Sequence, residues 1–185
     1  PGLFGSEAFW WDRLSDRESR TVPAQVRARV FRQLGGRQEE ALAWGRHSGL
    51  LGDPLPSLYA PASEEEVVAA GGMPGVTLGS HTWSHVHLPS VPLEEAREEL
   101  RTSLEWLRRI GVRDLPYVSY PYGAASRSVM AIAVQAGYEG GLLVAGGPTS
   151  VGKLQSAPFE NPRLNVPRGL SREGFAARVM GAWFR

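Results

Sequence analysis

Cysteine is the first thing this sequence lacks. The 185 residues contain none. A disulfide framework, a thiol nucleophile and every thiolate metal site are therefore excluded. Histidine and the carboxylates remain as the strong metal ligands available to the chain.

An excess of charge and a long apolar run are also missing. Twenty Lys and Arg side chains face nineteen Asp and Glu, and the basic residues are scattered along the chain. This balance argues against nucleic acid as a partner. No apolar run is long enough for a transmembrane helix, so we expect one globular domain over residues 1–185. The first residue is Pro1 and no signal-peptide pattern follows it, so we expect the parent protein to continue upstream.

The chain falls into two parts with different predicted secondary structure. Residues 1–75 form an irregular, helix-rich segment, with helices predicted over 9–14, 23–34 and 63–70. Residues 76–185 alternate between strands and helices, which indicates a parallel α/β sheet or barrel. The strands are predicted at 76–78, 117–120, 142–144 and 164–166, and the helices at 92–111, at 126–136 and from Ser171, where Phe175, Val179 and Trp183 share one side. Four strands are too few for a closed eight-stranded barrel.

The helix predicted over 92–111 has the clearest periodicity. Apolar side chains recur at steps of three and four, which places them on one face. An acidic run stands near its start, where negative charge complements the helix dipole, and we interpret that run as a solvated face. The apolar positions are Leu93, Ala96, Leu100, Leu104, Leu107 and Ile110, and the acidic ones are Glu94, Glu95, Glu98 and Glu99.

Two histidines four residues apart follow the strand predicted at 76–78. They are His81 and His85 in His81-Thr82-Trp83-Ser84-His85. Imidazoles at this spacing can converge on one metal ion, and ligands of α/β folds gather at the carboxyl ends of strands. The spacing alone is also compatible with two surface or capping histidines.

A second motif, Tyr120-Pro121-Tyr122-Gly123, ends the strand predicted at 117–120 about 35 residues later. Taken alone it is an aromatic strand with an ordinary turn, which would expose backbone N–H groups at the same edge. Together and in this order, the two motifs resemble those of the polysaccharide deacetylases, the NodB-homology domain of carbohydrate esterase family 4. The resemblance is strong from Val76 to Tyr138 and looser elsewhere.

The resemblance implies a distorted and here incomplete (β/α)7 barrel. It implies a divalent metal ion, usually zinc, held by His81, His85 and an Asp. The backbone N–H of Tyr122 would stabilise the oxyanion, and the side chains of Thr82 and Ser84 would fix the imidazole tautomers. We expect Trp83, Tyr120 and Pro121 to contact the substrate, with Trp83 as a stacking platform.

Two parts of the family pattern have no match in this sequence. There is no Asp-Asp pair for the ligand and general base, since the aspartates are Asp12, Asp16, Asp53 and Asp114. We expect that motif upstream of Pro1. The late histidine that serves as general acid is missing, because the last histidine is His87. The arginine that often precedes Pro-Tyr-Gly is replaced, and Arg163 is a candidate substitute.

The remaining histidines and tryptophans have simpler interpretations. His87 could complete a three-histidine site, but a surface position is favoured. His47 is expected in a loop. Core packing or helix anchoring is expected for the five tryptophans other than Trp83, which are Trp10, Trp11, Trp44, Trp106 and Trp183.

We therefore predict a metal-dependent hydrolase that deacetylates an N- or O-acetylated polysaccharide or oligosaccharide. The expected partners are glycans and not nucleic acid. Two alternatives remain open. One is an inactive carbohydrate-binding protein of the same fold, and the other is a metal-dependent hydrolase of a non-sugar amide. The resemblance also implies a location outside the cytoplasm, at the cell envelope or in secretions.

Overall fold

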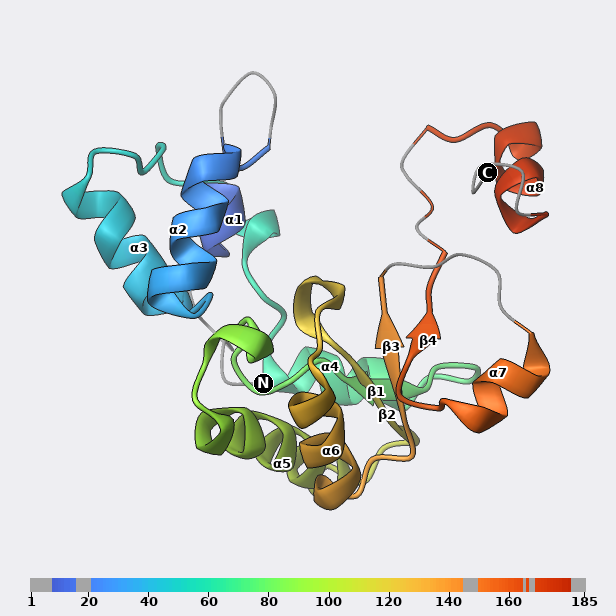
Figure 1. The fold of residues 1–185 in the computed structure, drawn as a ribbon. Coiled ribbons are helices and arrows are strands. Elements are labelled where there is room, and N and C mark those ends of the chain that lie inside the picture. Colours follow the sequence, from blue (N-terminus) through green and yellow to red (C-terminus); the bar gives the residue numbers. More distant parts are fainter. Residues whose placement is uncertain (1–7, 16–20, 145–149, 165, 167–168, 181–185) are drawn as a thin grey trace.

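A four-stranded parallel sheet organises the computed structural model (Figure 1), which describes residues 8–15, 21–144, 150–164, 166 and 169–180. Its strands lie in the order β1-β2-β3-β4, and each neighbouring pair is parallel. They are β1 (Leu78–Ser80), β2 (Asp114–Ser119), β3 (Gly140–Leu143) and β4 (Asn161–Pro162). The parallel α/β prediction is confirmed.

Helices connect the successive strands. They are α5 (Leu93–Arg109) between β1 and β2, α6 (Arg127–Ala136) between β2 and β3, and α7 (Val151–Ser156) between β3 and β4. The side chain of Ser126 caps α6 by accepting a hydrogen bond from the N–H of Val129, and Gly137 ends that helix in a left-handed conformation. These boundaries agree with the prediction for this helix.

The main core lies where α5 and α6 pack side by side against the sheet (Figure 1). The apolar stripe of α5 supplies Ala96, Leu100 and Leu104, β2 supplies Val118, and Tyr120 follows directly after β2. Leu93 was predicted on the same face but is 51% exposed. It stands at the first position of α5, before the helix reaches the sheet.

A second core holds the N-terminal helices together. These are α1 (Trp10–Arg13), α2 (Ala24–Leu34) and α3 (Gln38–His47), which gather to one side of the sheet (Figure 1). Trp10 is buried in this core, and the partly buried Tyr122, which follows β2, packs against it. Arg37, just before α3, forms two hydrogen bonds of 2.7 and 2.6 Å with the carboxylate of Glu95 on α5. The N-terminal helices are thus joined directly to the end of the sheet where Tyr122 lies.

Several short elements complete the described chain. α4 (Glu64–Gly71) begins at the predicted cap Ser63, which forms a full capping box with Glu66. The chain also contains η1 (Ser57–Tyr59), η2 (Leu88–Ser90), η3 (Pro121–Gly123) and α8 (Arg172–Val179). Among the described residues, no helix is both long and apolar enough to cross a membrane.

Three local predictions are wrong. The strand predicted at 76–78 begins only at Leu78, because the N–H of Val76 bonds to the carbonyl of Met73 in a turn. No strand forms at 164–166, where Asn165 lies outside the described residues, and β4 pairs at Asn161 and Pro162 instead. His47 is the last residue of α3 rather than part of a loop.

The predicted apolar side of the last helix is not buried either. Phe175 and Val179 on α8 are 45% and 49% exposed, and Trp183 lies outside the described residues. The described residues therefore give α8 no core to pack against, in contrast to α5 and α6.

Candidate active site

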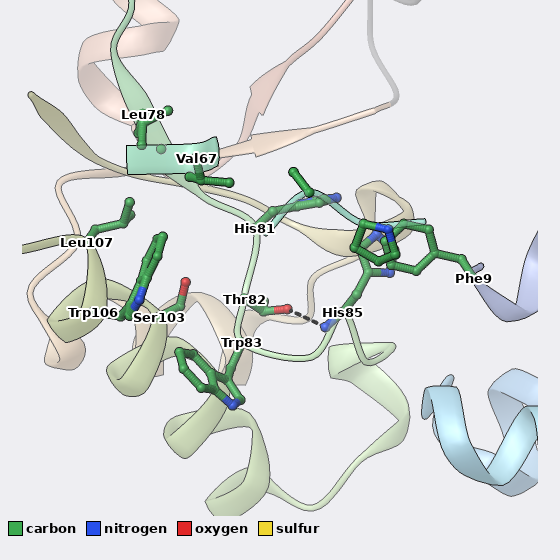
Figure 2. A pocket seen from close by; sticks show the side chains of 13 residues that line it. Phe9, Val67, Leu78, His81, Thr82, Trp83, His85, Ser103, Trp106 and Leu107 are labelled. Atoms are coloured by element: carbon green, nitrogen blue, oxygen red, sulfur yellow. Dashed lines mark hydrogen bonds between the residues drawn. The ribbon is translucent and has the colours of Figure 1, made fainter. Parts of the chain in front are cut away.

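The two motif histidines converge at the carboxyl end of the sheet. His81 follows the last residue of β1, and the loop returns so that the His85 ring lies beside the His81 ring (Figure 2). The ring centroids are 4.6 Å apart and the ring planes are nearly perpendicular. Two imidazoles at this separation can reach one ion at the usual Zn–N distance of about 2.0–2.1 Å.

The ring nitrogens of His81 have distinct surroundings. Its Nδ1 forms a hydrogen bond with the backbone carbonyl of Ser119, the last residue of β2. A carbonyl can only accept, so this nitrogen carries the proton and Nε2 of the neutral ring keeps its lone pair. Burial lowers the pKa of His81, and the charge of Arg163 lowers it further. His81 is therefore a neutral ring with one nitrogen available as a ligand.

His85 is also held neutral. Burial and the neighbouring His81 lower its pKa to about 3. Its Nδ1 is buried and has no hydrogen-bond partner within the described part of the chain. An unpaired buried ring nitrogen is costly unless a ligand satisfies it. The two-histidine site therefore fits a divalent metal ion, for which neutral imidazole is a standard ligand.

A buried carboxylate holds the loop between the histidines. Glu99 on α5 accepts hydrogen bonds from the N–H groups of Trp83 (3.0 Å) and Ser84 (2.7 Å) and from the hydroxyl of Ser84 (2.5 Å). It is only 8% exposed. Its place on a solvated acidic face was therefore predicted wrongly. The spacing offered a signal, because Glu99 lies three residues after Ala96 on the buried stripe.

The hydroxyl groups within the motif also act on the backbone. Oγ1 of Thr82 accepts a hydrogen bond from the N–H of His85 at 3.2 Å (Figure 2). The hydroxyl of Ser84 donates to Glu99. Neither is within hydrogen-bond distance of an imidazole nitrogen among the described contacts. The prediction that these two side chains fix the ring tautomers is therefore replaced by a role in shaping the loop.

A buried hydroxyl network fixes the end of β1 immediately before His81. Oγ of Ser80 lies 2.9 Å from Oγ of Ser103 on α5 and 2.6 Å from the hydroxyl of Tyr138. The Tyr138 hydroxyl also lies 2.9 Å from the carbonyl oxygen of Leu100. This network was not predicted, because single serines and a tyrosine carry no local signal of meeting one another.

Backbone strain is concentrated at the same place. Within the described residues, the non-glycine positions with positive φ are Thr82 (65°), His85 (60°) and Tyr122 (57°). Such conformations cost about 1–3 kcal/mol each and persist only where the surroundings enforce them. All three belong to the two motifs. The surrounding contacts therefore hold these residues in backbone conformations that are unfavourable in isolation.

Tyr122 stands in the tight turn after β2. The turn η3 is closed by hydrogen bonds from the N–H groups of Gly123 to Tyr120 (2.9 Å) and of Ala124 to Pro121 (3.1 Å). The N–H of Tyr122 forms no hydrogen bond within the described chain, so it is free of the sheet ladder. The Tyr122 ring packs perpendicular to His85 at 4.8 Å, and its hydroxyl accepts a hydrogen bond of 3.1 Å from Nε1 of Trp10.

Two predicted substrate contacts do not agree with the structure. Tyr120 is fully buried beneath β3, where a side chain at Gly141 would collide with its hydroxyl. Pro121 is also fully buried. These residues shape the turn from below and present no side chain to a substrate. Trp83 remains partly exposed beside the histidines.

Two hollows meet at the histidine pair. An apolar recess of about 370 Å³ runs past Trp83 and is lined by Val67, Leu78, Trp106 and Leu107 (Figure 2). The second hollow, of about 430 Å³, is more polar. It brings Asp12, Arg163, Trp11 and Tyr122 to the same two rings.

Three side chains of the polar hollow bear on the predictions. Partial burial raises the pKa of Asp12. Arg163 reaches the hollow while its Nε donates to the carbonyl of Leu143 at 3.2 Å, so the candidate substitute for the family arginine does lie at the site. Trp11 was expected only in the core, but its ring lies 4.6 Å from that of His85. Trp10 and Trp106 are buried as expected.

A third metal ligand is not found among the described residues. They contain no group of three His, Asp or Glu side chains arranged to hold one ion. His87 does not complete the set, because its ring stacks on Phe31 at 4.5 Å and its Nδ1 lies 2.7 Å from Oγ of Ser90. His81 and His85 thus provide part of a coordination sphere.

Fold and site together define a class, the parallel α/β proteins with a histidine pair at the carboxyl end of the sheet. Residues 56–141, which include both motifs, match the family model described as polysaccharide deacetylase. Over these residues the chain is similar to the polysaccharide deacetylases.

Curated relatives agree over a shorter stretch. Chitin deacetylase 1 of Saccharomyces cerevisiae is 38% identical over 63 residues, which cover 34% of this chain and 21% of that protein. Chitin deacetylase 2 of the same yeast is 35% identical over 65 residues, or 35% of this chain and 21% of that protein. The chain therefore spans about a fifth of the length of these relatives.

Solved structures show the same fold. The Streptococcus pyogenes deacetylase PplD, determined in complex with acetate, superposes with a TM-score of 0.54 at 16% identity, covering 65% of this chain and 51% of that one. A polysaccharide deacetylase from Bacillus cereus gives 0.54 at 19% identity, covering 77% and 48%. The fold prediction is confirmed, and the match to about half of each structure agrees with an incomplete barrel.

Proposed function

We propose that this domain belongs to a metal-dependent hydrolase that removes acetyl groups from an acetylated polysaccharide or oligosaccharide. The observation that carries the proposal is the convergence of two imidazoles beside the ring of Tyr122, at the carboxyl end of a parallel sheet. The family match over both motifs and the two yeast chitin deacetylases support this substrate class.

His81 and His85 would hold the divalent ion, and zinc is among the metals that imidazole ligands suit. When bound, such an ion polarises an acetyl carbonyl and supplies an activated water. The N–H of Tyr122 would donate a hydrogen bond to the oxygen that becomes negative as the acetyl carbon is attacked. Its turn keeps that N–H out of the sheet ladder, and the Trp10 contact anchors the Tyr122 ring.

A carboxylate ligand and general base would come from sequence preceding Pro1. β1 is the terminal strand of the described sheet, and the apolar recess runs beside it with Leu78 and Val67 in its lining. An edge strand offers backbone N–H and C=O groups for pairing, so an added strand would pair with β1 beside this recess. It would also bring its carboxyl end toward the two histidines.

Trp83 would contact the glycan, because it is partly exposed at the rim of the recess next to His81. The polar hollow, with Arg163 and Asp12, offers hydrogen-bonding groups for sugar hydroxyls on the other side of the rings. Since acetylated glycans are concentrated at cell surfaces, this substrate class favours an extracytoplasmic location.

The test compares this 185-residue chain with the same chain extended by any sequence that precedes it in its gene. Acetate release from acetylated chito-oligosaccharides and acetylated xylan is measured with zinc and with a chelator. We expect little or no turnover by the short chain, because the base is missing, and zinc-dependent turnover by the longer one. That turnover should disappear in His81→Ala. Chelator-sensitive turnover by the short chain would instead assign the base to an aspartate within it, such as Asp12.

A carbohydrate-binding protein without catalysis is the second candidate. It is favoured by one observation, the lack of a third His, Asp or Glu ligand among the described residues. Binding of acetylated chito-oligosaccharides to the longer chain, with no acetate release at any zinc concentration, would support this candidate over the hydrolase.

A further inference from the structure

We infer that Glu99 is a positioning residue, whose buried carboxylate holds the loop between His81 and His85 so that the two rings converge. This inference deepens the proposed function, because it assigns the group that keeps the metal ligands in place. Glu99 acts through the backbone of the loop and not by touching the ion or the substrate.

The contacts lie at the centre of the loop. Oε2 of Glu99 accepts from the N–H of both Trp83 and Ser84, and Oε1 accepts from the hydroxyl of Ser84. Trp83 is midway between the histidines, and Ser84 directly precedes His85. Charge-assisted hydrogen bonds of this kind are shorter and about twice as strong as neutral ones. The carboxylate therefore restrains the backbone of the loop at the residues that set the position of the His85 ring relative to the His81 ring.

The loop needs an external restraint. Thr82 and His85 both have positive φ, which local preference disfavours for residues with a Cβ. Without an acceptor on α5, the two N–H groups would also be left without their partners. Both costs would be relieved if the backbone relaxed toward ordinary conformations. Such relaxation would move His85 relative to His81, which is fixed to β1 and to the carbonyl of Ser119.

Direct roles for Glu99 are ruled out by its surroundings. Both of its oxygens are already engaged by donors from the loop. It is 8% exposed and does not line the apolar recess or the polar hollow. A group in this position cannot accept a proton from a water at the histidines.

The experiment replaces Glu99 with glutamine, which keeps the shape of the side chain but removes its charge and one of its two acceptor oxygens. Glu98→Gln is the matched control, because Glu98 is the preceding residue on α5 and faces solvent, bonded to Arg101. Ser84→Ala is a milder variant that removes only the hydroxyl donor. Circular dichroism and urea unfolding establish that each variant is folded.

Two readouts report on the site itself. The first is calorimetric titration of each protein with zinc chloride alone. The second needs no metal and measures nuclear Overhauser contacts between the ring protons of His81 and His85. Loss of an outer partner of a metal site typically lowers metal affinity by about 10–100-fold. We expect that decrease in Glu99→Gln and a decrease of about 3–10-fold in Ser84→Ala. Glu98→Gln should match the unaltered protein.

The outcomes distinguish failure of the positioning role of Glu99 from failure of the proposed metal site. Folded Glu99→Gln protein that keeps both its zinc affinity and its ring contacts would overturn the positioning role. If Glu99→Gln does not fold, unchanged zinc affinity and ring contacts in Ser84→Ala would overturn it. If neither the unaltered chain nor the chain extended by its preceding sequence binds zinc, the proposed metal site is wrong. The ring contacts then decide the role of Glu99, which is supported by their loss in Glu99→Gln and refuted by their persistence.

Discussion

The hydroxyl of Tyr138 provides a quantitative test of how β1 is anchored next to His81. Replacing Tyr138 with Phe removes contacts of 2.6 and 2.9 Å to Ser80 and to the carbonyl of Leu100, in a side chain that is only 4% exposed. Because buried partners are left less satisfied, we expect a loss of about 1–3 kcal/mol in the free energy of unfolding. For a chain of this length, a loss of about 2 kcal/mol lowers Tm by roughly 4–8 °C.

The pH dependence gives the same substitution a second signature. Burial raises the pKa of Tyr138 from 10.0 to about 12. Above pH 10 the unfolded chain therefore releases this proton while the folded chain keeps it, and stability falls as the pH rises. A single such tyrosine contributes a loss of about 1.4 kcal/mol per pH unit until the folded pKa is reached. Below pH 10 this contribution is fully present and constant.

The assay is urea unfolding between pH 7 and pH 11, with Tyr59→Phe as the matched control because Tyr59 is exposed. Tyr138→Phe should be destabilised at neutral pH and should lose less stability than the unaltered chain above pH 10. Tyr59→Phe should resemble the unaltered chain throughout. Equal stability of Tyr138→Phe at pH 7, together with an unchanged alkaline slope, would refute the buried network as an anchor of β1.

Three further substitutions test the turn, the recess rim and the link between the cores. Gly123→Ala should cost about 1–2 kcal/mol or more in urea unfolding, since Gly123 has φ of 68° and a Cβ would collide with Val144; unchanged stability would contradict this turn geometry. Trp83→Ala in the longer chain should weaken binding of acetylated chito-oligosaccharides roughly tenfold by calorimetry, and equal affinity would exclude the platform role. Arg37→Ala should cost about 0.5–1 kcal/mol through loss of the half-buried Glu95 pair, less at 1 M NaCl, and a salt-independent cost would refute an electrostatic origin.

Periodicity and end signals account for the parts of the fold that could be predicted. α5 and α6 carry apolar stripes over at least ten residues, and Ser126 and Gly137 mark the ends of α6 by local hydrogen bonds. β4 could not be placed in this way, because a two-residue strand has no periodicity. Its position follows from pairing with β3, which is a tertiary interaction.

The site was predictable to the extent that its chemistry lies in contiguous motifs. His81 and His85 could be paired from their spacing, and the turn at Tyr122 from its Pro and Gly neighbours. Glu99 reaches the loop, and Ser103 reaches Ser80 at the end of β1, only because α5 packs under them. Tyr138 reaches Ser80 only because β3 follows α6 back to the sheet. Residues that meet only through tertiary packing leave no local sequence pattern. A Glu on an otherwise apolar stripe nevertheless indicates a buried carboxylate that needs hydrogen-bond partners.

The three strained residues explain why the site needs these packed partners. Thr82, His85 and Tyr122 each have a positive φ, which together amounts to about 3–9 kcal/mol of unfavourable local energy. That sum is comparable with the whole stability of a typical domain. Glu99 offsets it on the histidine loop, and the partly buried ring of Tyr122 offsets it through contacts with Trp10 and His85. The packing of α1 and α5 therefore determines the positions of the two imidazoles and of the Tyr122 N–H. Substitutions in those helices should alter the geometry of the site even where the substituted residue does not contact a ligand.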